Sequence, residues 1–295
     1  MADDELQEAR DNFYVGNFQR ALDLCESTGA ANDIQQNELG ATLARCCLSI
    51  PLFERLKLMQ NSECPGQRAA AFMAVILKSR NEQQRGSAKE RLLGLAKETQ
   101  DMSCAMLSAI TLALDGTWTE AAAMTQGHPT LEMQALAVFF CLACNQVGMA
   151  ENKLQQMAGK NDDCAAYRLA SAAMKLATGD SEEAYLTYCD LCTQFPLAEG
   201  DEGGSVLLLT GKALANMQRG MYGEAVEDLQ RALATAPADP DVLVNLCGCM
   251  THLGKKDEFQ QYYAKLEQAA PTHPYVAKTQ GMKTVFERFK ASLTA

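Results

Sequence analysis

Apolar residues along most of the chain recur at intervals of three and four, which places them on one face of an α-helix. The amphipathic segments are separated by short turns rich in glycine and proline. Near the C-terminal end the turns are regularly spaced, because Gly220 and Gly254 lie 34 residues apart, as do Pro237 and Pro271. Runs of β-branched and aromatic residues bounded by hairpin turns are scarce. The pattern predicts repeated helical hairpins and almost no β-strand.

An interval of 34 residues is the period of the tetratricopeptide repeat, a helix–turn–helix unit that buries its apolar face by stacking on copies of itself. Gly220 is expected to end the first helix of one unit, and Pro237 to end the second. Ala225 lies where the two helices must cross closely. The same small residue recurs in earlier units at Ala184, Ala150, Ala121 and Ala21. The sequence therefore predicts an all-α, tetratricopeptide-like helical-hairpin solenoid that forms a right-handed superhelix.

The predicted solenoid covers residues 1–274, and residues 275–295 are predicted to form a C-terminal helical cap or extension. Residues 33–100 keep helical periodicity without a clean repeat signature, so irregular repeats are expected there. The segment 198–204 is predicted to be a longer connection between repeats. In the last repeat Phe259 and Leu266 replace the usual small residues, so its helices are expected to splay or shift register.

Charge and hydropathy narrow the classes of partner. The net charge of −11 disfavours direct binding to nucleic acid or to an anionic membrane, because both depend on clustered Lys and Arg. No apolar stretch approaches the roughly 20 residues that a membrane-spanning helix needs. The N-terminal MADDELQEAR lacks the basic and apolar regions of a signal peptide. A cytoplasmic protein is expected.

The chain contains 12 cysteines, and two pairs have the spacing found in zinc and redox sites. These pairs are Cys141-x-x-Cys144 and Cys189-x-x-Cys192. Both fall within predicted amphipathic helices and have no histidine nearby. Cysteine in such positions behaves as a small buried hydrophobic residue. We therefore expect no metal site and no cofactor.

The histidines give little support for catalysis. His128 and His273 each precede a proline, which favours extended backbone and therefore a turn position. His252 is expected late in a first helix of a hairpin, facing a groove or solvent. The chain contains no phosphate-binding glycine-rich loop, metalloprotease helix or nucleophile elbow. A non-enzymatic protein is expected.

Solenoids of this type bind partners on the concave surface, which is built by the first helix of each hairpin. Positions projected from the turn residues onto that surface are mostly apolar, which is unlike the basic carboxylate clamp of a chaperone adaptor. An apolar inner face predicts a groove that binds an apolar segment of a partner. The alternative is that the curvature closes these residues against one another or against a terminal helix. The predicted groove residues are Met106, Ile110, Leu114, Phe139, Leu142, Leu169, Leu176, Leu214 and Met217.

Four segments give the chain a resemblance to the epsilon subunits of coatomer. In order along almost the whole chain they are NFYVGNFQ at 12–19, LLLTGKA at 207–213, LVNL at 243–246 with HLGK at 252–255, and HPYV at 273–276. The resemblance implies a non-catalytic structural subunit of the COPI vesicle coat that binds the C-terminal region of the alpha coat subunit.

The same resemblance implies a role in Golgi-to-ER retrograde and intra-Golgi transport. It also implies a cytoplasmic protein that is peripheral on Golgi membranes and COPI-coated vesicles only through the coat. Two alternatives remain: a tetratricopeptide-repeat scaffold of another cytosolic complex, and a chaperone adaptor.

Overall fold

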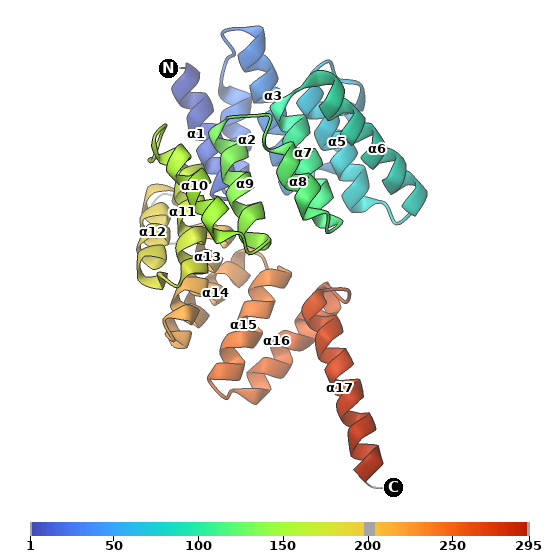
Figure 1. The fold of residues 1–295 in the computed structure, drawn as a ribbon, viewed down its shortest axis with the longest axis vertical. Helices are drawn as coiled ribbons and strands as arrows, with labels where there is room; N and C mark the ends of the chain where they lie inside the picture. Colours follow the sequence, from blue (N-terminus) through green and yellow to red (C-terminus); the bar gives the residue numbers. More distant parts are fainter. Residues whose placement is uncertain (1, 198–203, 294–295) are drawn as a thin grey trace. The chain divides into compact units, whose positions relative to one another are not determined.

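A computed structural model describes residues 2–197 and 204–293 (Figure 1). Within these ranges the chain is α-helical, with one short 3₁₀ helix and no strand. Within each compact unit, successive helices pair as antiparallel hairpins that stack on their neighbours. The predicted all-α solenoid of tetratricopeptide-like hairpins is confirmed. No helix in the described ranges is long and apolar enough to cross a bilayer.

Contacts divide the chain into two compact units, Met1–Asp180 and Ser181–Ala295. The first helices of the hairpins in unit 1 are α1 (Ala2–Tyr14), α3 (Asp33–Ser49), α5 (Pro65–Lys78), α7 (Met102–Leu114), α9 (Leu131–Ala143) and α11 (Ala165–Thr178). The first five of these pair in order with α2 (Phe18–Ser27), α4 (Phe53–Leu58), α6 (Glu82–Thr99), α8 (Trp118–Met124) and α10 (Val147–Ala158), and α11 is the last helix of unit 1. Unit 2 contains α12 (Ser181–Gln194), α13 (Val206–Gln218), α14 (Tyr222–Thr235), α15 (Pro240–His252), α16 (Lys256–Ala269) and α17 (Pro274–Leu293).

The division at residue 180 was not predicted from the sequence. The boundary after residue 274 stays a prediction, although α17 begins at Pro274. Between residues 33 and 100 the helices vary in length, from six residues in α4, which is followed by the 3₁₀ helix Met59–Asn61, to 18 in α6. Residues 198–203 of the predicted connection lie outside the described residues.

The turn inside most hairpins contains one residue with left-handed backbone geometry. Gly220 and Gly254 adopt φ values of +77° and +70°, and Asn145 takes the same role at +57°. Asparagine tolerates this region better than most side chains, which explains a hairpin without glycine. Five residues after the turn comes an alanine with no exposed surface, as predicted: Ala21, Ala121, Ala150, Ala184 and Ala225. The backbones of the paired helices can therefore approach closely at this position.

The last repeat keeps the left-handed turn but has Phe259 at the alanine position. The Phe259 ring is half-buried and stacks on Tyr263, with ring centres 5.8 Å apart. Leu266 is fully buried and packs with Leu243 and with Val276 from the first turn of α17. Leu266 is thus covered by the helix that follows it, whereas Phe259 packs against the cluster that contains Leu229 and Leu246.

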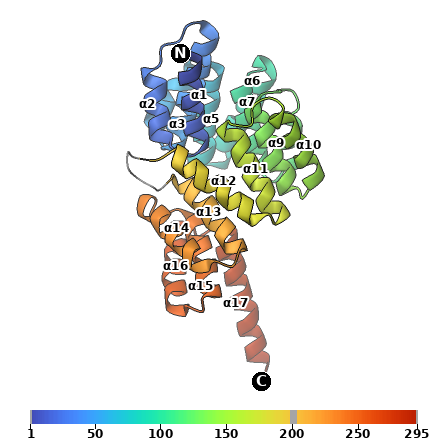
Figure 2. The ribbon, with the colours of Figure 1, turned by 90° about the vertical axis from the view of Figure 1, so that its left-hand side faces the viewer.

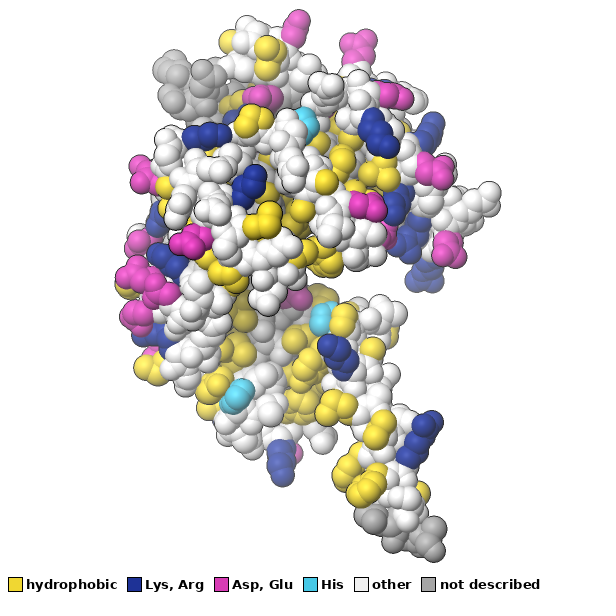
Figure 3. Space-filling view, in the orientation of Figure 1, with side chains coloured by type: hydrophobic (Ala, Val, Ile, Leu, Met, Phe, Trp, Pro, Cys, Tyr) yellow, Lys and Arg dark blue, Asp and Glu magenta, His cyan; other side chains and the backbone are white. Residues whose placement is uncertain are grey.

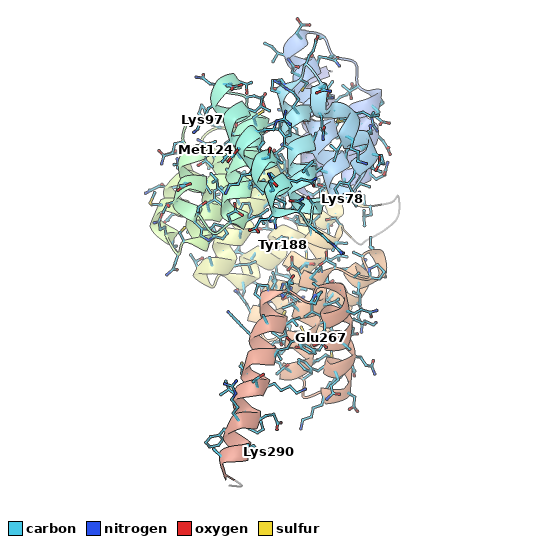
Figure 4. The ribbon with its side chains drawn as sticks, turned by 90° about the vertical axis from the view of Figure 1, so that its right-hand side faces the viewer. Lys78, Lys97, Met124, Tyr188, Glu267 and Lys290 are labelled. Carbon is cyan, nitrogen blue, oxygen red and sulfur yellow. The ribbon has the colours of Figure 1, made fainter. Side chains whose placement is uncertain are left out.

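In unit 2, α12 and α13 approach closely at Gly211. A Cβ atom at this position would lie 2.3 Å from Cε1 of the Tyr188 ring, so only glycine fits. The Lys212 ammonium pairs with the buried Asp228 carboxylate of α14 at 2.9 Å and lies over the Tyr185 ring of α12. Tyr188 lies on α12 in Figure 4. This part of unit 2 is held by the close contact at Gly211, by the ion pair of the buried Asp228 carboxylate, and by an ion pair of Arg219 with Glu182 of α12 at 2.7 Å.

Candidate partner-binding site

The first helix of unit 1 closes onto the last. Helix α1 contacts its sequence neighbours α2 and α3 (Figure 2) and also α11. A carboxylate oxygen of Asp11 accepts a hydrogen bond from the backbone N–H of Ala165, the first residue of α11, at 3.0 Å. A carboxylate at this end of a helix also interacts favourably with the helix dipole. Burial raises the pKa of Asp11 above its ordinary value.

An adjacent arginine joins α1 to two further helices. The Arg10 guanidinium lies 2.7 Å from the Glu38 carboxylate on α3 and 3.7 Å from the Glu132 carboxylate on α9. A cavity of about 240 Å³ opens beside these groups. Its walls are charged and polar as well as apolar, and its lining residues are Gln7, Arg10, Asp11, Tyr14, Glu38, Met102, Thr130, Leu131, Glu132, Cys164 and Ala166.

A second arginine lies inside the packing of unit 1. Arg45 of α3 is only 3% exposed and donates hydrogen bonds to Thr42 Oγ1 at 3.0 Å and to the Tyr14 hydroxyl at 3.3 Å. Its guanidinium also contacts the Met106 sulfur and lies 5.1 Å from the centre of the Phe13 ring. Burial raises the pKa of Tyr14 to about 12, so the phenol that accepts this bond stays neutral at physiological pH. The interior of unit 1 therefore contains polar side chains that bind one another.

Cys141, Cys189 and Cys192 lie within helices as predicted, whereas Cys144 is the residue that caps the C-terminal end of α9. Cys141 and Cys192 are buried, while Cys144 and Cys189 are half-buried. Burial raises the pKa of Cys141 and of Cys192, which favours the unreactive thiol form. In the described part of the chain, no three His, Cys, Asp or Glu side chains gather in a way that could hold a metal ion.

A sequence model described as "Coatomer epsilon subunit" matches residues 2–294. The chain belongs to the coatomer epsilon subunit family. Family membership supports a role as a subunit of the COPI coat. Similar proteins include coatomer subunit epsilon-1 of Oryza sativa subsp. japonica, which is 27% identical over 97% of this chain and 96% of its own length. Coatomer subunit epsilon-2 of Arabidopsis thaliana is 26% identical over 97% of this chain and 95% of its own length.

Solved structures with low sequence identity share the fold of this epsilon-family chain. A chain of the APC/C hetero-tetramer Cut9-Hcn1 gives a TM-score of 0.64 at 12% identity, covering 92% of this chain and 53% of that one. A tetratricopeptide repeat protein from Parabacteroides merdae gives 0.55 at 12% identity, covering 94% and 96%. These likenesses show the hairpin-repeat fold and nothing about partners.

The predicted groove residues of this epsilon-family chain differ widely in exposure. In unit 1, Met106 and Leu169 are buried at 5% and 8% exposure. Leu114 and Phe139 are exposed, at 63% and 41%. The half-buried members of the set are Ile110, Leu142 and Leu176 in unit 1 and Met217 in unit 2, where Leu214 is 36% exposed. The structure therefore brings Met106 into the packing against Arg45 and leaves Leu114, Phe139 and Leu214 accessible.

The polar centre formed by Arg10, Tyr14, Arg45 and Glu132 was not predicted from the sequence. The groove positions predicted from the turn residues lie only in the middle and later hairpins, and they are apolar. A signal for Arg45 was present, because it stands alone as a charged residue in the small and apolar run ATLARCCL. An isolated charge within such a run indicates a buried polar group that requires partners from other helices.

Proposed function

We propose that this chain is a non-catalytic structural subunit of the COPI coat that binds and stabilises the C-terminal region of the alpha coat subunit. The family match over residues 2–294 is the observation that carries the proposal. Through this partner the chain takes part in Golgi-to-ER retrograde and intra-Golgi transport. It is cytoplasmic and reaches Golgi membranes and COPI vesicles only as part of the coat.

Binding takes place on the inner faces of the hairpins, through the accessible members of the nine predicted groove residues. The exposed Leu114 and Phe139 of unit 1 offer apolar surface that a partner segment would remove from water, at about 25 cal/mol per Å². The cavity beside Arg10 and Glu132 offers polar groups near the N-terminal ends of α7 and α9. An apolar segment with a few hydrogen-bonding groups fits this combination.

Phe139→Glu tests the proposal directly. The substitution should weaken binding of the purified C-terminal region of the alpha coat protein roughly tenfold or more, because burying an unpaired carboxylate costs free energy in the complex. Phe139 is a better position than Leu176, which is half-buried in the free chain and would also disturb its packing. Binding can be measured by isothermal titration calorimetry, with helicity checked by circular dichroism.

Met149→Glu is the matched control. Met149 is 52% exposed and lies in the same unit on α10, the second helix of its hairpin. The Met149→Glu substitution adds the same charge away from the inner face. The affinity for the alpha-subunit region should therefore stay within about twofold of that of the unsubstituted chain. Failure of the unsubstituted chain to bind the alpha-subunit region would refute the proposed function. Equal affinities of the Phe139→Glu and Met149→Glu variants would show that the alpha-subunit region does not contact Phe139.

A further inference from the structure

The contacts shown between helix α17 and the rest of unit 2 lie in its first two turns, over the residues that the structure describes. Val276 is fully buried with Leu243 and Leu266, and the Gln280 side-chain amide donates a 2.8 Å hydrogen bond to Glu267 of α16. From residue 281 to residue 292 every residue is exposed. Figure 4 shows Glu267 on α16 and Lys290 on the part of α17 that extends beyond α15 and α16. More than half of the helix is therefore exposed to solvent on all sides.

The extended part carries an apolar stripe made of four large residues. Met282, Val285, Phe286 and Phe289 are 73%, 65%, 64% and 59% exposed. Their spacing is i, i+3, i+4 and i+7, which places them on one face and is the pattern of a helix that inserts into a groove. Figure 3 shows hydrophobic side chains along α17 with basic side chains beside them. An exposed contiguous stripe of this kind marks an interaction surface.

The charges on α17 indicate which charges a complementary groove on a partner should carry. The helix has one acidic residue, Glu287, and four basic residues, Lys278, Lys283, Arg288 and Lys290, in a chain of net charge −11. At about 100° per residue, Lys283 and Lys290 flank one side of the stripe and Arg288 the other. A complementary surface is an apolar groove with carboxylates along both rims.

We infer that α17 docks as a helix into an acidic-rimmed apolar groove on the C-terminal region of the alpha coat subunit, as a contact separate from the inner faces of the hairpins. The inference rests on the proposed function, which supplies this partner. The stripe covers roughly two helical turns, whereas a helix lying on a membrane needs a long apolar face and usually a second anchor. Two copies of α17 would bring their basic flanks together, which disfavours self-pairing.

The test compares two double variants of the full chain with matched charge. Phe286→Glu with Phe289→Glu places two carboxylates on the stripe, and Thr284→Glu with Ala291→Glu places two on the opposite face. In titrations with the purified C-terminal region of the alpha coat protein, the stripe variant should bind roughly tenfold more weakly or worse. The opposite-face variant should stay within about twofold of the unsubstituted chain. Circular dichroism checks that both variants keep their helicity.

Charge reversal tests the acidic rims. Lys283→Glu with Lys290→Glu leaves the stripe intact but should weaken binding, and the remaining affinity should depend less on salt concentration. In the unsubstituted complex, backbone amides of residues 281–292 should gain protection from hydrogen exchange.

The outcomes separate this inference from the proposed function. If the stripe variant binds the alpha-subunit region as tightly as the unsubstituted chain, the docking of α17 is wrong and the proposed function stands. If the unsubstituted chain does not bind that region, both are wrong. If the stripe substitutions leave that affinity unchanged but abolish self-association, or binding to phosphatidylserine-containing vesicles, then α17 contacts a second copy or a membrane and the inference is overturned.

Discussion

Arg45 places a cationic group in the packed interior of unit 1, where the atoms that accept its hydrogen bonds are uncharged. Arg45→Ala should lower the free energy of unfolding by about 3 kcal/mol, because it leaves a void and removes the partner of Tyr14 and Thr42. Arg45→Met keeps most of the volume and removes the cost of burying the charge, so its loss should be smaller, about 1 kcal/mol. Urea unfolding followed by circular dichroism measures both. A loss for methionine as large as that for alanine would contradict this account.

Ionisation of the Tyr188 phenol should affect the stability of unit 2 at high pH. Burial raises its pKa to about 12 from the ordinary value of 10.0. Up to about pH 10 the phenol is protonated in both states, but between about pH 10 and pH 12 the unfolded chain loses the proton first. The free energy of unfolding should therefore fall by up to about 2–3 kcal/mol across this window.

Tyr188→Phe should remove this contribution to the alkaline loss. Part of the pH dependence should remain, because the pKa of Tyr14 is raised to about 12 by burial as well. Urea unfolding at several pH values from about 9 to about 12 gives the slopes. An unchanged slope in the variant would show that Tyr188 ionises normally in the folded chain.

At the scale of helices, the contact between α12 and α13 depends on the absence of a side chain at residue 211. Gly211→Ala should destabilise the chain by about 2–4 kcal/mol, because the new Cβ would overlap the buried Tyr188 ring. Gly223→Ala, in the first turn of α14, is the matched control, since a Cβ added there would have no neighbouring atom within 4 Å. It should be neutral or stabilising by up to about 1 kcal/mol. Equal effects in urea unfolding would contradict the steric argument.

Hairpin geometry was predictable because it is encoded within one repeat. The turn residue and the alanine five positions later are local, and Ala150 could be assigned even though Asn145 replaces glycine. The approach of α1 to α11 joins residues 154 apart in sequence, through Asp11 and Ala165, and no repeat period contains that information. Met106, projected onto the inner face, is buried because it packs with Met133 of α9 and contacts the Arg45 guanidinium of α3, and neither contact is contained in a repeat period.

At the scale of the whole molecule, each unit has its own core. Unit 1 contains a cluster built around Leu56, Met73 and Leu92, and unit 2 contains clusters built around Leu229 and Leu243. In hairpin solenoids each repeat contacts mainly its neighbours, so stability is a sum of local terms and does not have to be shared evenly. A local defect should therefore loosen nearby helices before distant ones.

Hydrogen exchange of Gly211→Ala tests this view of the molecule. Amides of α12, α13 and α14 should lose protection by roughly 30-fold for a loss of about 2 kcal/mol, because they flank the overlapping Cβ. Amides of α3 and α5 in unit 1 should keep their protection, and Gly223→Ala should leave both units unchanged. A uniform loss over residues 2–293 would mean that the two units unfold as one cooperative body. In that case the stability of the chain could not be assigned hairpin by hairpin, and the inner face of unit 1 would respond to substitutions in unit 2.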